Sequence, residues 1–498
     1  MERVGMNGAA LTSELLSARE ELPVELDFVL PDDCPDIAKI LRGSFRLGQN
    51  AAAYTDGGIL AEGSVFADVW YIADTGAVFR VTGRTAFSKK IGCDTGAGAR
   101  VAPAASGTST YCNARAVNQR RIECKGAMML RADYAAPSRQ SYMTSCDRGD
   151  LELLPETRTF LLPTGQAFAR TALDEERPLP GDLPDPAAIL RMEGAAAVTD
   201  RKQVEGKVMV KGELRITLCL APSGEGAPFP AQFAAPFSQL IELEGLTETS
   251  DCDIRCEMLW CDAELRADES GRKRTAALRG EAMLTVSANQ PQELSAVTDA
   301  FGLKFRTEPC RTALTLPHRI AAVNGRTPFE WVCDPPVAGA SAVLDAWSAC
   351  SVQPARRTDA GLEIPVRVSV LGLLLDQNER PAFLEKTGEV TVSVPTDAAD
   401  PVLACVCAAV EGLRLTIEEN GVICRGEVAV QGVLYDRVRW EVLEGVELDP
   451  DAPLPPAPSP LTMLWAAGDA PLWELAKRYA VPLSALHMQD GFALVERM

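Results

Sequence analysis

The chain has 498 residues, with 69 acidic against 49 basic side chains, so its formal net charge is −20. This charge argues against a protein that holds a nucleic-acid backbone, because no basic field would displace the counterions of the phosphates. No apolar run approaches the roughly 20 residues that a membrane-spanning helix needs. At roughly 150 residues per domain, the length predicts about three domains.

The start of the chain shows no basic stretch followed by an apolar one, so we expect no secretory signal and a reducing cytoplasm. The 15 cysteines are irregularly spaced and odd in number. We therefore interpret them as thiols that fill the core as small hydrophobic residues. A zinc site, the alternative, would favour paired C-x(2–4)-C motifs at hairpin tips. Cys252, Cys256 and Cys261 instead lie in a strand-like run, and Cys405 and Cys407 share one face of a strand.

Three short patterns recur along the chain in the same order. The first, PDIAKIL ending at Leu41, returns as PDPAAIL ending at Leu190 and more weakly as SAVL ending at Leu344, after 149 and 154 residues. The second is a Phe-Ser pair at Phe87, which returns 150 residues later at Phe237. The third closes each copy with a glycine before an apolar run, at Gly126, Gly280 and Gly426. Their order and spacing predict three copies of one unit, of which the third is the most diverged.

Strand periodicity dominates within each copy. Gly63–Gly83, Lys211–Gly224 and Ile364–Glu379 are apolar runs that end in Asp, Gly, Ser or Asn turns, which is typical of hairpins. Glu389–Val394 alternates, so one of its faces is expected to be solvated. A short apolar helix is predicted to open each copy at the Leu41-type pattern. The fold class is therefore predicted as mainly β, with three repeated antiparallel β-domains.

The predicted organisation has five parts. The three copies span 20–150, 151–295 and 296–448, a Pro-rich linker spans 449–460, and a small module spans 461–498. The six prolines of the linker predict an extended, semi-rigid polyproline segment.

A strand followed by a helix is predicted at the start of the C-terminal module. Asp469 can cap the free amides of that helix. One apolar stripe is predicted along the helix, formed by Leu472, Leu475, Ala476 and Tyr479. Pro482 would begin a second short helix, and the last residues would return as a strand. The predicted order is βααβ.

No catalytic motif is visible, since the sequence has neither a Gly-rich phosphate loop nor a nucleophile elbow. His318 and His487 are the only histidines, which leaves little room for histidine catalysis. Neighbouring carboxylates such as Asp32 and Asp33 fit a solvated acidic surface better than a glycosidase pair. We expect a protein that is not an enzyme and that needs no cofactor or metal.

Two stretches resemble known families. GDAPLWELAKRYAVPLSAL in the C-terminal module is similar to the LysM pattern G-D-T-L-W-x-I-A-K-x-Y. LPDDCPDIAKIL at Leu30–Leu41, with the Phe-Ser motifs at Ala86–Ser88 and Pro236–Ser238, resembles the SPOCS repeats of spore-coat-associated proteins. The whole order resembles coat morphogenetic proteins of the SipL type from endospore-forming bacteria.

That resemblance implies an adaptor made in the mother-cell cytoplasm and recruited to the forespore surface. Such a protein engages a SpoIVA-type coat morphogenetic ATPase and other coat proteins, so that the coat layers are tethered to the spore. Other LysM modules bind peptidoglycan, so a protein that binds peptidoglycan or cortex glycan is the alternative.

Partner or glycan contacts are implied at the loops Ala467–Ala470 and Met488–Gly491 and at the helix between them. The implied residues are Gly468, Asp469, Ala470, Trp473, Lys477, Tyr479, Gln489 and Asp490. This sequence departs from the LysM pattern by one extra residue between Asp469 and Trp473, and by Gln489 where the family usually has Asn. Trp473, Lys477 and Tyr479 also fit the alternative of a core residue and a solvated face.

Overall fold

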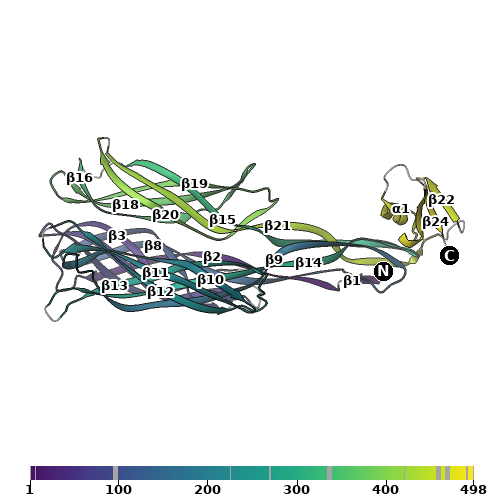
Figure 1. Cartoon of the computed structure of the whole chain (residues 1–498), viewed down its shortest axis with the longest axis horizontal. Helices are drawn as coiled ribbons and strands as arrows, with labels where there is room; N and C mark the ends of the chain where they lie inside the picture. The colour runs from purple at the N-terminus through teal and green to yellow at the C-terminus, as the bar shows by residue number, and fades with distance from the viewer. Residues whose placement is uncertain are drawn as a thin grey trace.

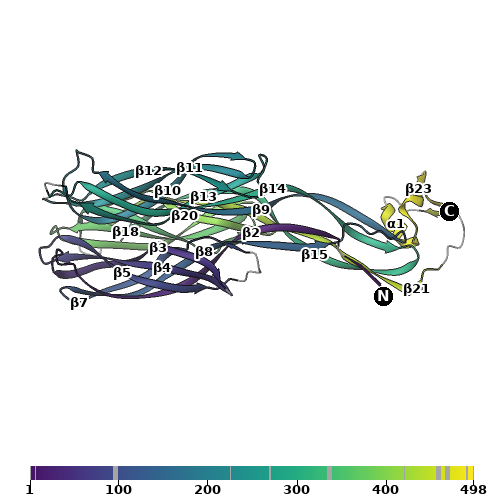
Figure 2. The same cartoon turned by 90° about the horizontal axis from the view of Figure 1, so that it is seen from below.

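The computed structural model describes residues 2–5, 7–55, 57–93, 99–224, 226–268, 271–333, 339–419, 421–455, 461–465, 471–489 and 492–496. Figure 1 shows an elongated molecule, in which a broad head of β-sheets narrows into a stalk of long strands. A small C-terminal module lies at the far end of the stalk, near the N-terminus. The view from below shows the sheets of the head side by side (Figure 2). The prediction of a mainly β fold is confirmed.

The first segment consists of two antiparallel sheets. Its strands are β2 (Gly8–Val29), β3 (Ile37–Thr55), β4 (Gly58–Ala73), β5 (Val78–Ile91), β6 (Arg100–Val101), β7 (Ser106–Asn118) and β8 (Arg121–Tyr142). One sheet has β8 between β2 and the strands β6 and β7, and the other has the order β3-β4-β5. The long strand that opens the segment therefore pairs with the long strand that closes it.

The same pairing order occurs in the next two segments. The second contains β9 (Leu151–Pro178), β10 (Pro186–Val204), β11 (Lys207–Pro222), β12 (Phe229–Glu242), β13 (Asp251–Arg266) and β14 (Thr275–Gly302). The third contains β15 (Phe305–Cys333), β16 (Ala340–Val352), β17 (Arg356–Thr358), β18 (Gly361–Asp376), β19 (Pro381–Pro395), β20 (Pro401–Glu418) and β21 (Gly421–Pro453). β9 pairs with β14 and β15 with β21, while β10-β11-β12 and β16-β18-β19 form the second sheets. That the segments descend from one unit stays a prediction.

Each segment has an apolar core between its two sheets. In β4 the inward residues alternate with the outward ones, as a pleated strand requires. Ile59, Val65 and Tyr71 on its inner face are fully buried. The predicted hairpin at Gly63–Gly83 is confirmed by the pairing of β4 with β5. The alternation of Glu389–Val394 is confirmed in β19, where buried and exposed residues alternate.

The predicted helices at the Leu41-type patterns are wrong, because these residues form the starts of β3, β10 and β16. Each of these strands has two register shifts three residues apart, and the second falls at Leu41, Leu190 and Leu344 respectively. A β-bulge adds one residue to a strand and turns the following side chains to the other face. Two bulges three residues apart therefore give a strand the apolar spacing of a helix.

These bulges turn the three leucine side chains toward the junction of the three segments. Leu41, Leu190 and Leu344 pack in a single apolar cluster, to which all three segments contribute. Trp347 extends the cluster, with its ring centroid 5.9 Å from that of Trp70. The Trp70 indole donates a hydrogen bond to the Leu190 carbonyl at 2.7 Å. The recurring pattern thus forms the junction of the three segments.

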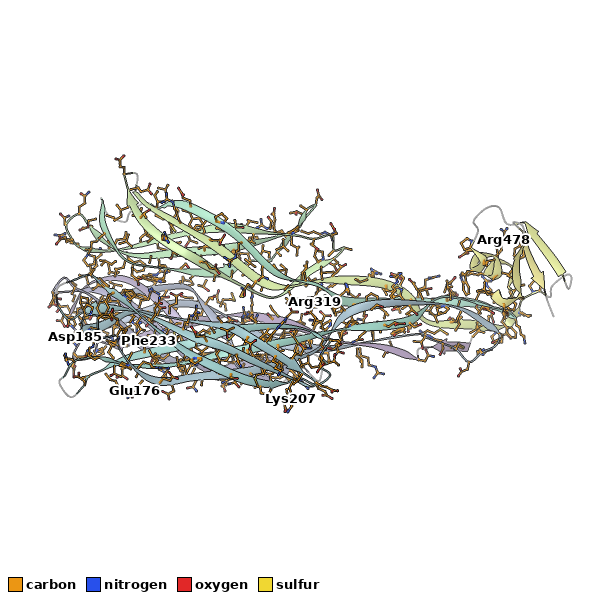
Figure 3. The ribbon with its side chains drawn as sticks, viewed as in Figure 1. Glu176, Asp185, Lys207, Phe233, Arg319 and Arg478 are labelled. Carbon is orange, nitrogen blue, oxygen red and sulfur yellow. The ribbon has the colours of Figure 1, made fainter. Side chains whose placement is uncertain are left out.

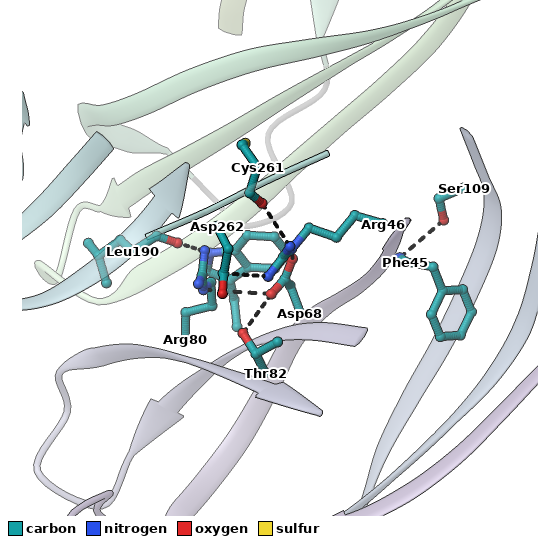
Figure 4. Close-up of polar contacts among 10 residues, drawn as sticks. Phe45, Arg46, Asp68, Arg80, Thr82, Ser109, Leu190, Cys261 and Asp262 are labelled. Carbon is teal, nitrogen blue, oxygen red and sulfur yellow. Dashed lines mark hydrogen bonds and ion pairs between the residues drawn. The ribbon is translucent and has the colours of Figure 1, made fainter. Parts of the chain in front are cut away.

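Buried ion pairs also join the segments. Figure 4 shows Arg46 of β3, whose Nε lies 2.7 Å from Asp68 Oδ2 and whose Nη1 donates to the Cys261 carbonyl in the second segment at 3.0 Å. Burial alone would raise the pKa of Asp68, but Arg80 and Arg46 outweigh it and hold that pKa below its ordinary value. The buried Asp68 carboxylate is therefore charged and needs its arginine partners.

The second and third segments are joined where the head meets the stalk. Arg319 on β15 lies at this position (Figure 3), and its Nε is 2.7 Å from Asp253 Oδ2 on β13. Tyr435 on β21 donates to Asn289 Oδ1 on β14 at 3.0 Å. Both contacts involve buried or nearly buried side chains, so they fix the two segments against each other.

The stalk is formed by the far halves of the long strands, with β1 (Glu2–Gly5) paired to β21. Its core is a series of apolar clusters to which all three segments contribute. Phe160, Leu316 and Trp440 belong to the first cluster and are at most 5% exposed. Asp449–Pro453, the first part of the predicted linker, forms the end of β21, and residues 456–460 lie outside the described part of the chain.

The C-terminal module contains β22 (Leu461–Trp465), α1 (Leu472–Tyr479), a 3₁₀ turn (Leu483–Ala485), β23 (Leu486–Gln489) and β24 (Phe492–Glu496). The predicted βααβ order is wrong, because Pro482 begins only this turn and Leu486 then pairs with Val495 in the sheet β22-β24-β23. Pro471, without a side-chain hydrogen bond, is the N-cap of α1 in place of the predicted Asp469. In the described part of the chain, no helix is long and apolar enough to cross a membrane.

Candidate functional site at the tip of the stalk

The C-terminal module docks on the tip of the stalk through helix α1. Glu474 in its first turn and Lys477 in its last turn suit the helix dipole, and Ala480 ends it in the left-handed conformation. An apolar cluster joins Trp473, Ala476, Val481 and Leu486 of the module to Phe301 at the end of β14. The rings of Trp473 and Phe301 meet edge to face at 5.0 Å between centroids. A buried apolar contact therefore holds the module to the stalk.

Asp299 of β14 lies at the centre of the polar part of this contact. Its Oδ2 accepts a hydrogen bond from Trp473 Nε1 at 2.8 Å and pairs with Lys477 Nζ at 2.5 Å. Its Oδ1 lies 3.2 Å from Arg311 Nη2 on β15. Burial would raise the pKa of Asp299, but the bonds from Lys477 and Trp473 outweigh burial and lower it. The carboxylate is therefore charged at neutral pH, and its side chain is only 12% exposed.

The structure describes four of the eight predicted contact residues. Trp473 and Lys477 face the stalk and bind Asp299. Tyr479 is 38% exposed, and the Arg478 guanidinium lies 5.8 Å from its ring centroid. Gln489 is the last residue of β23. The other predicted residues lie outside the described part of the chain: Gly468, Asp469, Ala470 and Asp490.

The predicted apolar stripe on α1 is only partly correct. Ala476 is fully buried and Leu475 packs at the edge of the docked cluster. Leu472 and Tyr479, the two ends of the predicted stripe, are each 38% exposed, because Trp473 takes the buried position instead. Together with Leu483 of the 3₁₀ turn, also 38% exposed, they place apolar surface on the module outside the dock.

Sequence reasoning missed Asp299 and Phe301, which complete this site. Both lie in the run AVTDAFG, which the sequence presents only as a connection between two copies. Trp473 and Asp299 are 174 residues apart, so no local spacing pattern joins them. An Asp among apolar residues at the end of a predicted strand is a sequence signal that could have pointed to a buried carboxylate that needs a partner.

The cysteines are free thiols in this structure. Burial raises the pKa of the Cys252 and Cys261 thiols to about 11, and the pKa of Cys256 to about 12. Such groups are protonated at neutral pH and are poor nucleophiles and metal ligands. In the described ranges, no group of three or more His, Cys, Asp and Glu side chains could hold a metal ion.

One of the two histidines has a structural role. His318 Nδ1 accepts a hydrogen bond from the backbone N–H of Leu161 at 2.9 Å, which joins β15 to β9. Its ring packs edge-on against Phe160. Burial lowers the pKa of His318, only partly opposed by the charge of Asp436. The neutral ring that this bond requires is therefore the form present at neutral pH.

Comparison with known protein families finds a match in the second segment. Residues 185–266, which include β10 to β13, match the family described as SipL, SPOCS domain. The matched residues contain the Leu190 bulge and the Pro236–Ser238 motif, whereas the C-terminal module lies outside them, so its likeness to LysM stays a prediction. No curated protein and no solved structure matches the chain.

Proposed function

We propose that this chain is a non-enzymatic adaptor of the endospore coat, which joins coat proteins to the forespore surface by protein–protein contact. The match of residues 185–266 to the SPOCS domain carries this proposal. The family resemblance supplies the proposed partner, a SpoIVA-type morphogenetic ATPase, and the proposed place, the mother-cell face of the forespore.

The form of the molecule supports a tethering role. The three segments share a junction at Leu41, Leu190 and Leu344, and their long strands continue into one stalk. The module at the tip is thereby held far from the broad end of the head. A rigid body with separate ends can bind one partner at each end, which a chain of freely linked domains does less effectively.

The surface that we assign to the ATPase is the apolar part of the module outside the dock. Leu472, Tyr479 and Leu483 form it, while Trp473 and Lys477 are occupied by the stalk. Exposed aromatic and large apolar side chains are enriched where proteins bind one another. Contact through this surface would leave the dock intact.

A capture experiment tests the proposal. The purified full-length chain is immobilised and titrated with the ATPase, and the double variant Leu472→Ser, Tyr479→Ser is compared with it. We expect capture to weaken at least tenfold in the double variant, because the apolar contact area is removed. Val204→Ser with Leu240→Ser is the matched control, since these two apolar residues are 39% and 53% exposed on the head.

Pelleting with insoluble peptidoglycan separates the adaptor from the glycan-binding alternative. We expect the full-length chain to remain in the supernatant. In sporulating cells, we expect a fluorescent fusion of the chain to encircle the forespore. Co-sedimentation with peptidoglycan, together with no capture of the ATPase, would contradict the adaptor and favour the glycan-binding function.

A further inference from the structure

A cavity of about 490 Å³ lies between the first and third segments, apart from the module and its dock. β2 of the first segment forms one wall, and β20 and the middle of β21 form the other. Four prolines line it and give rigid apolar surface without N–H donors: Pro163, Pro317, Pro354 and Pro401. Its volume falls in the range of small-ligand sites in proteins.

The wall formed by β20 is broken by a β-bulge. The pairing of β20 with β21 runs from Ala404 opposite Val433 directly to Cys407 opposite Gln431, so Cys405 and Val406 have no partner in this ladder. Cys405 has a φ of 55°, in the left-handed region that residues with a side chain rarely adopt. Bulges and strained residues are frequent at binding sites, where they redirect backbone groups. Both bulge residues line the cavity.

Two arginines at this cavity have no carboxylate partner among the residues that the structure describes. Arg19 is exposed, and its Nη1 donates only to the Val352 carbonyl at 3.3 Å. Arg437 is exposed and its side chain makes no ion pair with any described residue. Arg131, in contrast, is neutralised by Asp133 and Glu257.

Among the described residues that line the cavity, Glu14 is the single acidic one. Arg19 and Arg437 together therefore leave the cavity with a net positive charge, in a chain whose own formal charge is −20. A positively charged cavity in a negatively charged chain favours a ligand that carries carboxylates.

We propose that this cavity is a binding cleft for an extended acidic peptide segment of a partner protein. The apolar side chains of the segment would lie between the prolines and Leu403, and its backbone would lie along the bulge at Cys405 and Val406. Its carboxylates would pair with Arg19 and Arg437. The proposal depends only on the geometry of this cleft and not on the function in the coat, so each can fail without the other.

A peptide titration tests the cleft. The probe is a fluorescein-labelled peptide of four Leu-Asp repeats, which places leucines and carboxylates on opposite sides when extended. Its fluorescence anisotropy is measured against the full-length chain. We expect saturable binding that weakens at least tenfold in Arg19→Glu with Arg437→Glu, and that is largely retained in Arg19→Lys with Arg437→Lys. Arg439→Glu is the matched control, because Arg439 lies two residues away on β21 and pairs with Glu441 outside the lining.

A second variant separates charge from shape. Ala355→Trp places an indole at an exposed position of the lining without changing any charge, and we expect it to weaken binding as well. Unchanged thermal unfolding of all variants would show that they fold. The proposal is overturned if the wild type does not bind the Leu-Asp peptide, if Arg439→Glu weakens binding as much as the double variant, or if a Leu-Lys peptide or an oligothymidine binds as tightly.

Discussion

Removal of the Asp299 carboxylate tests whether the C-terminal module is held to the stalk as the structure indicates. Asp299→Ala deletes the acceptor of the Trp473 indole and the partner of Lys477. A hydrogen bond to a charged group contributes about 1.5–3 kcal/mol, and a partly exposed ion pair contributes up to about 1 kcal/mol. Lys477 is 34% exposed, so its ion pair with Asp299 is expected to contribute no more than about 1 kcal/mol. The expected loss of docking free energy is about 2–4 kcal/mol.

Hydrogen–deuterium exchange of α1 measures this loss. An isolated eight-residue helix is marginal in water, so the amides of Leu472–Tyr479 exchange whenever the module leaves the stalk. At about 1.4 kcal/mol per tenfold change, the substitution is expected to speed their exchange about 30- to 1000-fold. Asp299→Asn keeps an oxygen acceptor but loses the charge, so its exchange should lie between those of the wild type and Asp299→Ala.

The control is Asp174→Ala, since the Asp174 side chain is 85% exposed on the head and pairs with Arg279 there. Exchange of α1 should be unchanged in this variant. If α1 exchanges at the wild-type rate in Asp299→Ala as well, then Asp299 does not hold the module, and the argument from its two short contacts is refuted.

Three further predictions concern the head and the stalk. Leu190→Ala, at the junction of the three segments, should lower the free energy of unfolding by about 2–5 kcal/mol in a urea titration, because Leu190 is 3% exposed; a loss below about 1 kcal/mol would show that the junction adds little. Asp68→Asn should cost about 3–5 kcal/mol in the same titration, since Arg80 is left buried and charged, and an unchanged midpoint would contradict the charged state of Asp68. Because the pKa of His318 is lowered in the folded chain, the unfolded chain binds a proton on this imidazole more readily. The stabilisation that the neutral His318 ring contributes is therefore fully present above about pH 6.5 and is lost as the pH falls from there through the folded-state pKa. His318→Gln should therefore flatten the decline of stability just below pH 6.5, and an unaltered slope would exclude His318 as its source.

Much of the head could be predicted from its sequence, because alternation of apolar and polar residues has a direct meaning in a strand that is buried on one face. The alternation of β19 is predicted for this reason, whereas the hairpin of β4 and β5 is predicted from an apolar run that ends in turn residues. The starts of β3, β10 and β16 were not, since the double bulge imitates helical spacing. Only the meeting of Leu41, Leu190 and Leu344 in space shows what the recurring pattern encodes.

The dock and the cleft could not be predicted from local patterns, because each is assembled from different segments of the chain. Trp473 was identified as a residue of interest on a helix, but its partner Asp299 is fixed by the register of β14 with β9. Arg19 and Arg437 are ordinary surface arginines in the sequence. They become distinctive only when the fold places them at one cavity, where neither pairs with a carboxylate of the described part of the chain.

The positions of the two proposed contact surfaces bear on how an adaptor of this shape would work. The cleft lies between the first and third segments, whereas the apolar surface of the module lies beyond the end of the stalk. Partners at these two places would not compete, and the packed stalk between them fixes their separation. When spacing is fixed, the second binding event loses little additional freedom, so two weak contacts can hold a layer of protein in place. Weakening of the dock by Asp299→Ala would loosen that spacing without touching either contact surface, and it should reduce simultaneous binding of two partners more than binding of either one.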